Sequence, residues 1–386
     1  MNFLGYVRED GSVGTRNYVG IIPTVGCVNE VARGIAQHVA LAVPLLHHQG
    51  CCQLSPDLDT VTKTLTSLGK NPNFGAVLLV GLGCEGISID RVMEGIAETG
   101  KPVEAIVIQD LGGSTNSVQQ GTAKAERLAF QLSAERKKPV DVSNIVVGIK
   151  CGSSDATSGL SSNPSTGYAS DKIVNCGGTV IFGETTEFLG AEHVLAERAV
   201  NKDVADKLLG IVDSMEKRAA SMGVDMRGGQ PTPGNINGGL TTIEEKSLGA
   251  IVKGGSCLIH DVLEYWESPS TTGLFIKDTP GREIEALTGL AAARAQIIVF
   301  STGRGAPQGF PGVPVVKVCG NSRTVKRMAD HIDLDVSGIV EGRTTISEEG
   351  ERLFSMILEV ASGTRTKAEL LHYDETMDIY TTGPVI

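Results

Sequence analysis

Aromatic residues are scarce in this chain of 386 residues, where Phe, Trp and Tyr together make up only 4%. Proteins that stack nucleobases rely on exposed aromatic rings, so the scarcity argues against such a platform. Basic residues are in deficit as well, because 34 Lys and Arg face 45 Asp and Glu and leave a net charge of −11. That charge disfavours non-specific binding to nucleic acid or to an anionic membrane.

Long apolar runs and paired cysteine motifs are also missing. No apolar stretch reaches the roughly 20 residues that a membrane-spanning helix needs, and the start, MNFLGYVREDG, lacks the basic and then apolar pattern of a signal peptide. The eight cysteines are dispersed without a CxxC pair, which predicts a cytoplasmic protein with free thiols or ligands, not a disulfide framework or zinc ribbon. Without a Walker A motif or a convincing dinucleotide fingerprint, we do not expect nucleotide binding.

Glycine, in contrast, is abundant: the chain has 48, whereas average usage would give about 27. Many glycines follow short apolar, β-branched runs that end in a polar or reactive side chain, which predicts strands followed by tight turns. Seven such runs occur, at 18–25, 76–82, 104–109, 145–149, 179–183, 297–300 and 314–318. Ligands bind at the carboxyl ends of parallel strands. Polar residues at seven strand ends therefore indicate a functional site. The alternative is that these turns have only a structural role in tight packing.

The length predicts two domains. We expect an α/β fold of two Rossmann-like lobes, each a mainly parallel sheet flanked by helices, with the active site at the carboxyl strand ends between them. Lys137-Lys138-Pro139 marks the boundary, so the lobes cover 1–138 and 139–386. The second lobe contains a Gly-rich loop at 228–242, whose length suggests a function, and ends in a tail expected to be a surface extension.

Cysteine, histidine and acidic residues at the strand ends suggest a metal. His47 and Cys51 could both reach one ion, because Gly50 permits a tight turn between them; a packed thiol and a surface histidine are the alternative. Cys84 with Glu85 is a second mixed pair, and Cys151 with Asp155 a third. Mixed soft and hard ligands suit Fe(II), Mn(II) or Zn(II) better than Mg(II) or Ca(II). Dispersed cysteines also leave an iron–sulfur cluster open.

Other strand ends offer acid–base and anion-binding groups. Glu184 and Glu187 lie three residues apart after a strand, where one could act as a general acid or a ligand; charges at a helix start are the alternative. Lys246 is either a surface lysine or a base whose pKa is lowered by burial. Arg304 lies between two glycines and could clamp a substrate carboxylate bidentately.

In combination, these motifs resemble the altronate/galactarate dehydratase family, lyases that act on 2-hydroxy acids. The resemblance spans almost the whole chain and is carried by GYVREDGSVGTRN (5–17), PTVGCVNE (23–30), HHQGC (47–51), GLGCE (81–85), KCGSSD (150–155), GAE (190–192), PGNINGGLTTIEEKSLG (233–249), KGG (253–255) and STGRG (301–305). It implies Fe(II) or Mn(II) as cofactor, whereas the iron–sulfur cluster is an alternative that the dispersed cysteines alone suggest.

The familiar members of this family carry a small N-terminal β-rich domain that this chain lacks. The resemblance therefore implies a large subunit, with the small β-rich subunit supplied as a separate chain. Two-subunit altronate dehydratases and sulfolactate sulfo-lyase are built in that way. We also expect a homo-oligomer.

The resemblance implies a metal-dependent lyase that removes a β-leaving group from a 2-hydroxy carboxylate and gives a 2-keto acid. The chain reads CGSSD where sugar-acid dehydratases typically read CGGSD, and Glu184-Thr-Thr-Glu187 where they read ExPE. These departures favour a short acid such as sulfolactate, with sulfite as the leaving group. A sugar-acid hydro-lyase is the alternative, and a non-catalytic scaffold subunit is the alternative from another class.

The residues expected to carry this chemistry fall into three groups. Those predicted to be catalytic are Lys246, Glu187, Glu184, Cys151 and Asp155, with Lys246 or a histidine as the base and Glu187 as the acid. Those predicted to bind substrate are Arg304, Thr302, Ser154, Asn235, Arg16 and Asn17. Those predicted to bind metal are His47, Cys51, Cys84 and Glu85.

Overall fold

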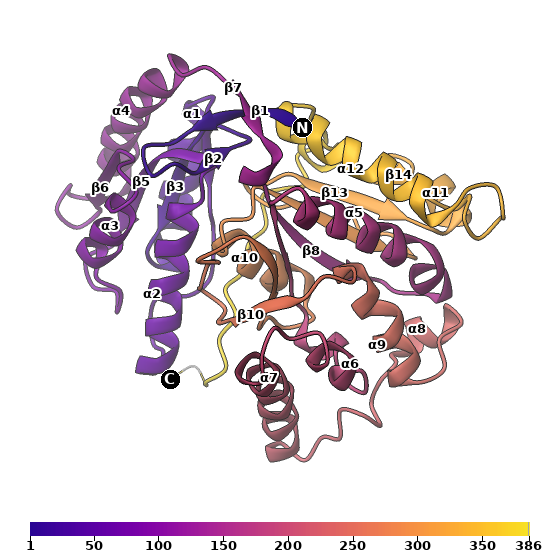
Figure 1. Cartoon of the computed structure of the whole chain (residues 1–386). Coiled ribbons are helices and arrows are strands. Elements are labelled where there is room, and N and C mark those ends of the chain that lie inside the picture. Colours follow the sequence, from indigo (N-terminus) through magenta and orange to yellow (C-terminus); the bar gives the residue numbers. More distant parts are fainter. Residues whose placement is uncertain (385) are drawn as a thin grey trace.

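Two parallel β-sheets, one in each of two adjoining lobes, form the framework of the protein (Figure 1). The computed structural model describes residues 1–384 and 386. The sheet of the first lobe has four strands in the order β4-β3-β5-β6. These are β4 (Ala42–Pro44), β3 (Tyr18–Pro23), β5 (Phe74–Gly81) and β6 (Val103–Val107). Every residue of β5 is buried, as expected for a parallel strand that helices cover on both faces.

Alternate residues of these strands face two helical layers. Val19 and Ile21 share one core with α1 (Asn29–His38) and α4 (Ser114–Ser133). Ile22 faces the other side, in a core that includes α2 (Ser55–Lys70) and α3 (Ile89–Ala97). This second core continues into the other lobe, so the two lobes are packed against each other.

The sheet of the second lobe has seven strands, in the order β10-β11-β9-β8-β12-β13-β14, with all neighbours parallel. Their bounds are β8 (Val146–Gly152), β9 (Thr179–Phe182), β10 (Ile259–Leu263), β11 (Gly273–Lys277), β12 (Ile297–Thr302), β13 (Val315–Cys319) and β14 (Leu334–Asp335). Helices α5 (Asn163–Asn175) and α12 (Ile346–Ser362) cover one face, and α10 (Glu283–Ala292) packs between the other face and α2.

Short helices complete the lobes and surround the strand ends. They are η1 (Gly26–Val28), η2 (Val142–Asn144), η3 (Ser158–Ser162), η4 (Thr185–Glu187), α6 (Glu192–Ala196), α8 (Pro233–Asn237), α9 (Ile243–Ile251), η5 (Val252–Gly254), α11 (Ser322–Arg327) and α13 (Lys367–Leu370). The longer α7 (Lys202–Ser221) packs against α6. Helix α8 lies inside the predicted Gly-rich loop, where Thr232 and Asn235 form a capping box.

The predicted lobe boundary lies in a strand. Lys138–Asp141 is β7, which pairs antiparallel with β1 (Asn2–Val7), and β1 also pairs with β2 (Val13–Gly14). Pro139 lies opposite Leu4 in this pairing. Proline is tolerated there because β7 is an edge strand of the small sheet.

The C-terminal tail crosses from the second lobe to the first (Figure 1). Its Met377 and Ile379 are buried in the shared core, and the backbone N–H groups of Thr382 and Gly383 donate to Asp57 at the start of α2. The expectation of a surface extension was therefore wrong. Apolar residues at alternate positions let this extended segment fill the seam. No helix in the described part of the chain is long and apolar enough to cross a membrane.

Candidate active site

The carboxyl ends of β8 and β9 open into a cavity of about 390 Å³. Residues of the second lobe line it: Cys151, Gly152, Ser153, Ser154, Thr186, Glu187, Gln230, Thr232, Asn235, Lys246, Gly281, Arg282 and Glu283. They come from the two strand ends, from the segment that leads into α8, from α9 and from the start of α10.

A fully buried ion cluster lies at the inner end of this cavity. The Lys253 ammonium donates to Glu184 Oε2 at 2.8 Å and to Cys151 Sγ at 3.0 Å. Lys150 Nζ lies 3.3 Å from Glu184 Oε1 and 4.1 Å from the centre of the Phe300 ring. The backbone N–H of Cys151 also donates to Glu184 Oε2, at 2.6 Å. Glu184 is therefore held from three sides, which stabilises its left-handed backbone at φ 73°.

A second ion pair forms the wall of the cavity. Lys246 Nζ on α9 donates to Glu187 Oε1 at 2.7 Å, and both side chains are about nine-tenths buried. The other carboxylate oxygen, Glu187 Oε2, is buried without a hydrogen-bond partner within residues 1–384 and 386. Since an ionised carboxylate normally accepts several hydrogen bonds, this oxygen is free to accept a proton from a bound molecule.

The charges at the inner end do not balance. Lys150, Lys246 and Lys253 face only two carboxylates, Glu184 and Glu187, which leaves a surplus of one positive charge when the Cys151 thiol is neutral. Burial raises the pKa of Cys151 to about 12 and outweighs the opposing effect of Lys253. The cavity is therefore suited to an anion.

Lysine and glutamate in the cluster keep their ordinary charges. Burial alone would lower the pKa of Lys253, but the carboxylates of Glu184 and Glu187 raise it. Burial alone would raise the pKa of Glu184, but Lys253 and Lys150 outweigh it and lower the value. Each charge is thus stabilised by the other.

Some predicted site residues build the rim of the cavity. Asn235 and Ser154 line it, and Asn235 Nδ2 donates to the Ser154 carbonyl at 2.9 Å. Asp155 is buried beside them, where its two oxygens accept from Thr157 Oγ1, Ser158 N and Asn321 Nδ2. These bonds shape the turn after β8.

Two further predicted residues, Thr302 and Arg304, lie at the end of β12. Thr302 Oγ1 accepts from the N–H of Gly305, which tightens that turn. Arg304 is exposed, and its NH1 donates to the Gly234 carbonyl at 2.7 Å. Arg304 therefore holds the α8 segment, and its side chain is not part of the cavity lining.

The structure does not bring Arg16 and Asn17 to this cavity. Arg16 makes a buried bidentate pair with Glu369, at 2.8 and 2.9 Å, and ties the first lobe to the C-terminal region. Asn17 Nδ2 donates to the Leu132 carbonyl at 3.0 Å. The side chains of both residues join segments far apart in the chain.

The four predicted metal ligands lie in the first lobe and do not form a ligand set. His47 is buried with both ring nitrogens engaged, because Nδ1 accepts from Gln49 N at 3.1 Å and Nε2 donates to the Pro23 carbonyl at 2.7 Å. Glu85 accepts from Thr24 Oγ1 and from the N–H groups of Leu82 and Gly83. Cys51 and Cys84 are exposed thiols. Across the described residues, no group of three or more His, Cys, Asp or Glu is arranged to hold a metal ion.

Several residues at the site were not predicted. Lys150 and Lys253 are fully buried. They lie in KCGSSD and KGG, two of the segments that carry the family resemblance, but neither lysine was predicted to belong to the site. For Lys150 the available signal was its position directly after the predicted strand 145–149, whereas Lys253 lies in η5, after helix α9. Arg282 at the cavity mouth also lies 3.5 Å from Asp378 of the tail, which in turn pairs with His48 of the first lobe.

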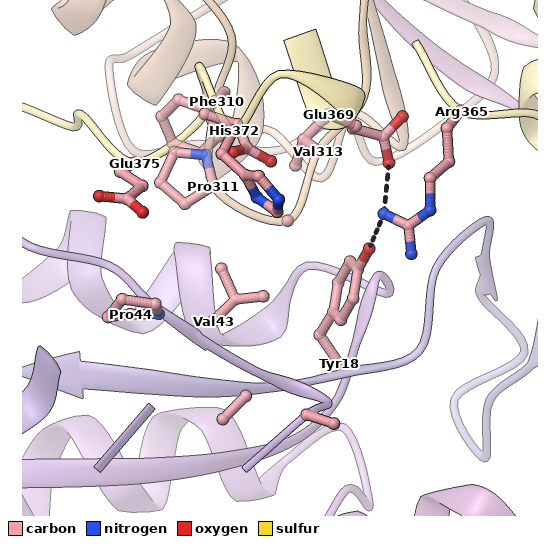
Figure 2. A pocket seen from close by; sticks show the side chains of 14 residues that line it. Tyr18, Val43, Pro44, Phe310, Pro311, Val313, Arg365, Glu369, His372 and Glu375 are labelled. Atoms are coloured by element: carbon pink, nitrogen blue, oxygen red, sulfur yellow. Dashed lines mark hydrogen bonds and ion pairs between the residues drawn. The ribbon is translucent and has the colours of Figure 1, made fainter. Parts of the chain in front are cut away.

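A second pocket, of about 260 Å³, lies in the seam between the lobes (Figure 2). Tyr18, Val43 and Pro44 of the first lobe form one side, and Phe310, Pro311 and Val313 of the second lobe form the other. Arg365 lies between Tyr18 and Glu369. The residues that line this pocket include none of those predicted for the active site, so the 390 Å³ cavity is the candidate.

Parallel sheets with buried acid–base groups at the strand ends define this protein as an α/β enzyme. Two family models match it: "D-galactarate dehydratase/Altronate hydrolase, second domain" over residues 5–133, and "D-galactarate/Altronate dehydratase, C-terminal" over residues 142–384. The chain belongs to the galactarate/altronate dehydratase family.

Relatives within the family differ in the substrates that their names give. The chain is 40% identical to the (2R)-sulfolactate sulfo-lyase subunit beta of Chromohalobacter salexigens, over 97% of this chain and 96% of that one. It is 37% identical to the galactarate dehydratase (L-threo-forming) of Escherichia coli, over 94% of this chain and 73% of that one. It is 33% identical to the altronate dehydratase of Bacillus subtilis, over 94% of this chain and 74% of that one. All three are named as lyases or dehydratases, and the chain is an enzyme of the lyase class.

Proposed function

We propose that this chain is the large subunit of a lyase that removes a β-leaving group from a 2-hydroxy carboxylate and yields a 2-keto acid, with (2R)-sulfolactate as substrate and sulfite as leaving group. The match to a sulfo-lyase subunit along almost the full length of both chains supports this substrate. The observation that carries the chemistry is Glu187 Oε2, a buried carboxylate oxygen of a residue that lines the cavity, which accepts no hydrogen bond from the described chain.

In this proposal Glu187, and not Lys246, takes the proton from C2 of the substrate. Lys246 is already an ammonium bound to Glu187 Oε1, so it orients the carboxylate and leaves Oε2 for the proton. The surplus positive charge beside Cys151 binds the substrate carboxylate and stabilises the negative charge that develops on it when C2 loses its proton. The group on C3 then departs; sulfite needs little protonation to leave.

A sugar-acid dehydratase is the second candidate, and the neutral polar lining of the cavity favours it. Gln230, Thr232 and Asn235 could hydrogen-bond the hydroxyl groups of a longer acid. The matches to galactarate and altronate dehydratases agree with this alternative.

The Fe(II) or Mn(II) cofactor remains a prediction from the family resemblance. The engaged atoms of His47 and Glu85 do not fit the ligand set predicted for it, so we derive no step through a metal. The separate small β-rich subunit is proposed because the sulfo-lyase relative is named as one subunit. A cytoplasmic location and a homo-oligomer also stay predictions.

A paired assay tests the proposal. The purified chain, with its small partner and Fe(II), is given (2R)-sulfolactate with detection of sulfite, and separately altronate and galactarate with detection of 2-keto acid. Sulfite release supports the proposal, and keto acid from a sugar acid alone selects the dehydratase. Turnover of none of these acids would overturn both.

A further inference from the structure

Cys151 lies where the buried ion cluster meets the cavity, and its chemical state has consequences for the reaction. We propose that Cys151 acts as a neutral thiol that donates a proton to the reaction intermediate, and that Lys253 is the positioning residue for this thiol. This inference rests on the proposed function, because it assigns the proton donor for the second half of the same reaction.

The hydrogen bond between the two residues has a defined direction. An ammonium group has three donors and no acceptor, so Lys253 Nζ must donate to Cys151 Sγ, across 3.0 Å. Lys253 is the one hydrogen-bond partner of this sulfur among the described residues. This bond leaves the S–H group of Cys151 available as a donor, and Cys151 lines the cavity.

The surroundings favour the thiol over the thiolate. Cys151 is only 1% exposed, and burial disfavours a charged sulfur. Two carboxylates, Glu184 and Glu187, also lie near it and disfavour a negative charge on the sulfur itself. Keeping the thiol neutral leaves the surplus positive charge for the carboxylate of the substrate.

Glu187 Oε2 is independent evidence that this part of the cavity receives a ligand. Among the residues that line this cavity, Glu187 Oε2 and Gln230 Oε1 are buried oxygens without a hydrogen-bond partner in the described chain, and only the first belongs to a carboxylate. A base on one wall and a proton donor at the inner end are what a β-elimination followed by tautomerisation requires. The two groups would act at neighbouring carbons of one substrate.

The proposed step is the conversion of the enol into the 2-keto acid. The S–H bond of Cys151 breaks, its proton joins C3, and the electron pair of the C2=C3 double bond forms the new C–H bond. The enol hydroxyl loses its proton as the C2 carbonyl forms, and that proton returns to the sulfur through solvent. Enol and ketone are isomers, so no other reactant is needed. Lys253 stabilises the transient thiolate.

The first test replaces Cys151 with Ala. We expect kcat for keto-acid formation to fall about 100-fold, as for loss of a general acid, with a KM change of less than about threefold. Cys319→Ala is the matched control, because Cys319 is equally buried in β13 but does not line the cavity. Full activity of the Cys151→Ala enzyme would overturn the inference while leaving the proposed function standing.

The second test asks whether Lys253 acts through Cys151. Lys253→Met should lower kcat, and the double variant Lys253→Met/Cys151→Ala should be no slower than Cys151→Ala alone. A merely structural role would make the two losses multiply, and multiplied losses would reject Lys253 as the positioning residue.

The third test needs no substrate. The ultraviolet absorbance of thiolate at neutral pH should be the same in the wild-type and Cys151→Ala proteins. A loss of thiolate absorbance in the variant would overturn the neutral thiol even if the enzyme turned over none of the assayed acids. The absorbance measurement thus tests the neutral thiol independently of the paired assay, which tests the proposed function.

Discussion

The carboxyl edges of the two sheets carry similar residues, but the residues are bonded differently. In the first lobe, His47 and Glu85 bond to backbone groups of their own turns and to Pro23 and Thr24 at the end of β3. In the second lobe, Glu187 lines the cavity, with one carboxylate oxygen bound to Lys246 and the other without a partner in the described chain. A polar side chain whose hydrogen bonds are all made within the protein stabilises a turn. A polar side chain beside a cavity that lacks a hydrogen-bond partner is available to react with a bound molecule.

Buried lysines show the same contrast. Lys277 donates to the carbonyls of Glu264 and Glu267, and burial lowers its pKa to about 7. Lys253 is equally buried but faces charged partners, which raise its pKa. The first lysine satisfies backbone oxygens, and the second organises a site.

The largest expected effect is on kcat, and it distinguishes the carboxyl edge of the second-lobe sheet from that of the first-lobe sheet. Glu187→Gln should lower kcat about 1,000-fold, because the amide cannot accept the C2 proton. Glu85→Gln, the matched change in the first lobe, should alter kcat less than about threefold while loosening its turn. Steady-state kinetics on the substrate found in the paired assay measure both. Equal losses would show that the first-lobe edge also takes part in the reaction.

Arg16 tests whether a predicted substrate ligand is in fact a structural residue. Arg16→Met leaves Glu369 buried without its main partner, so the free energy of unfolding should fall by about 3–5 kcal/mol. Activity per folded molecule should stay unchanged. Chemical denaturation measures the change in stability, and kinetics at matched folded fractions measure the activity. A higher KM with unchanged stability would instead show that Arg16 binds substrate.

His47 predicts a pH dependence of stability. Burial outweighs the hydrogen bond to Pro23 and lowers the pKa of His47 from 6.5 to about 4. Between these values the unfolded chain binds more protons, so the contribution of His47 is complete above pH 6.5 and is lost as the pH falls toward 4. The loss should reach about 3 kcal/mol. His47→Gln should remove that slope in denaturation experiments; an identical slope in both proteins would contradict it.

The smallest effect is expected at Arg304. Arg304→Gln removes a bond to the Gly234 carbonyl but no part of the cavity lining, so KM should rise only about two- to threefold through loosening of the α8 segment. A rise beyond about tenfold, measured on the same substrate, would instead support the carboxylate clamp predicted from its glycine-flanked position.

The seven predicted strands are all present, because apolar, β-branched runs bounded by glycine carry their own signal. β10 and β11 were missed. His260 and Asp261 interrupt the apolar pattern of β10. The strands β1, β2, β4, β7 and β14 were not predicted either. β10 is the edge strand of the large sheet, and β11 pairs with β10 on one side and with β9 on the other; a local pattern cannot express this pairing.

The sequence by itself determined the α/β class, the family and the strand ends at which reactive side chains stand. Only the tertiary structure decided which of those side chains work together. Lys253 reaches Cys151 across 102 positions of the chain, and Lys246 reaches Glu187 across 59. The strand pattern predicts which residues stand at the strand ends. The partners of their side chains come from distant segments of the chain, and these partners determine which hydrogen bonds form and which charge the side chain carries.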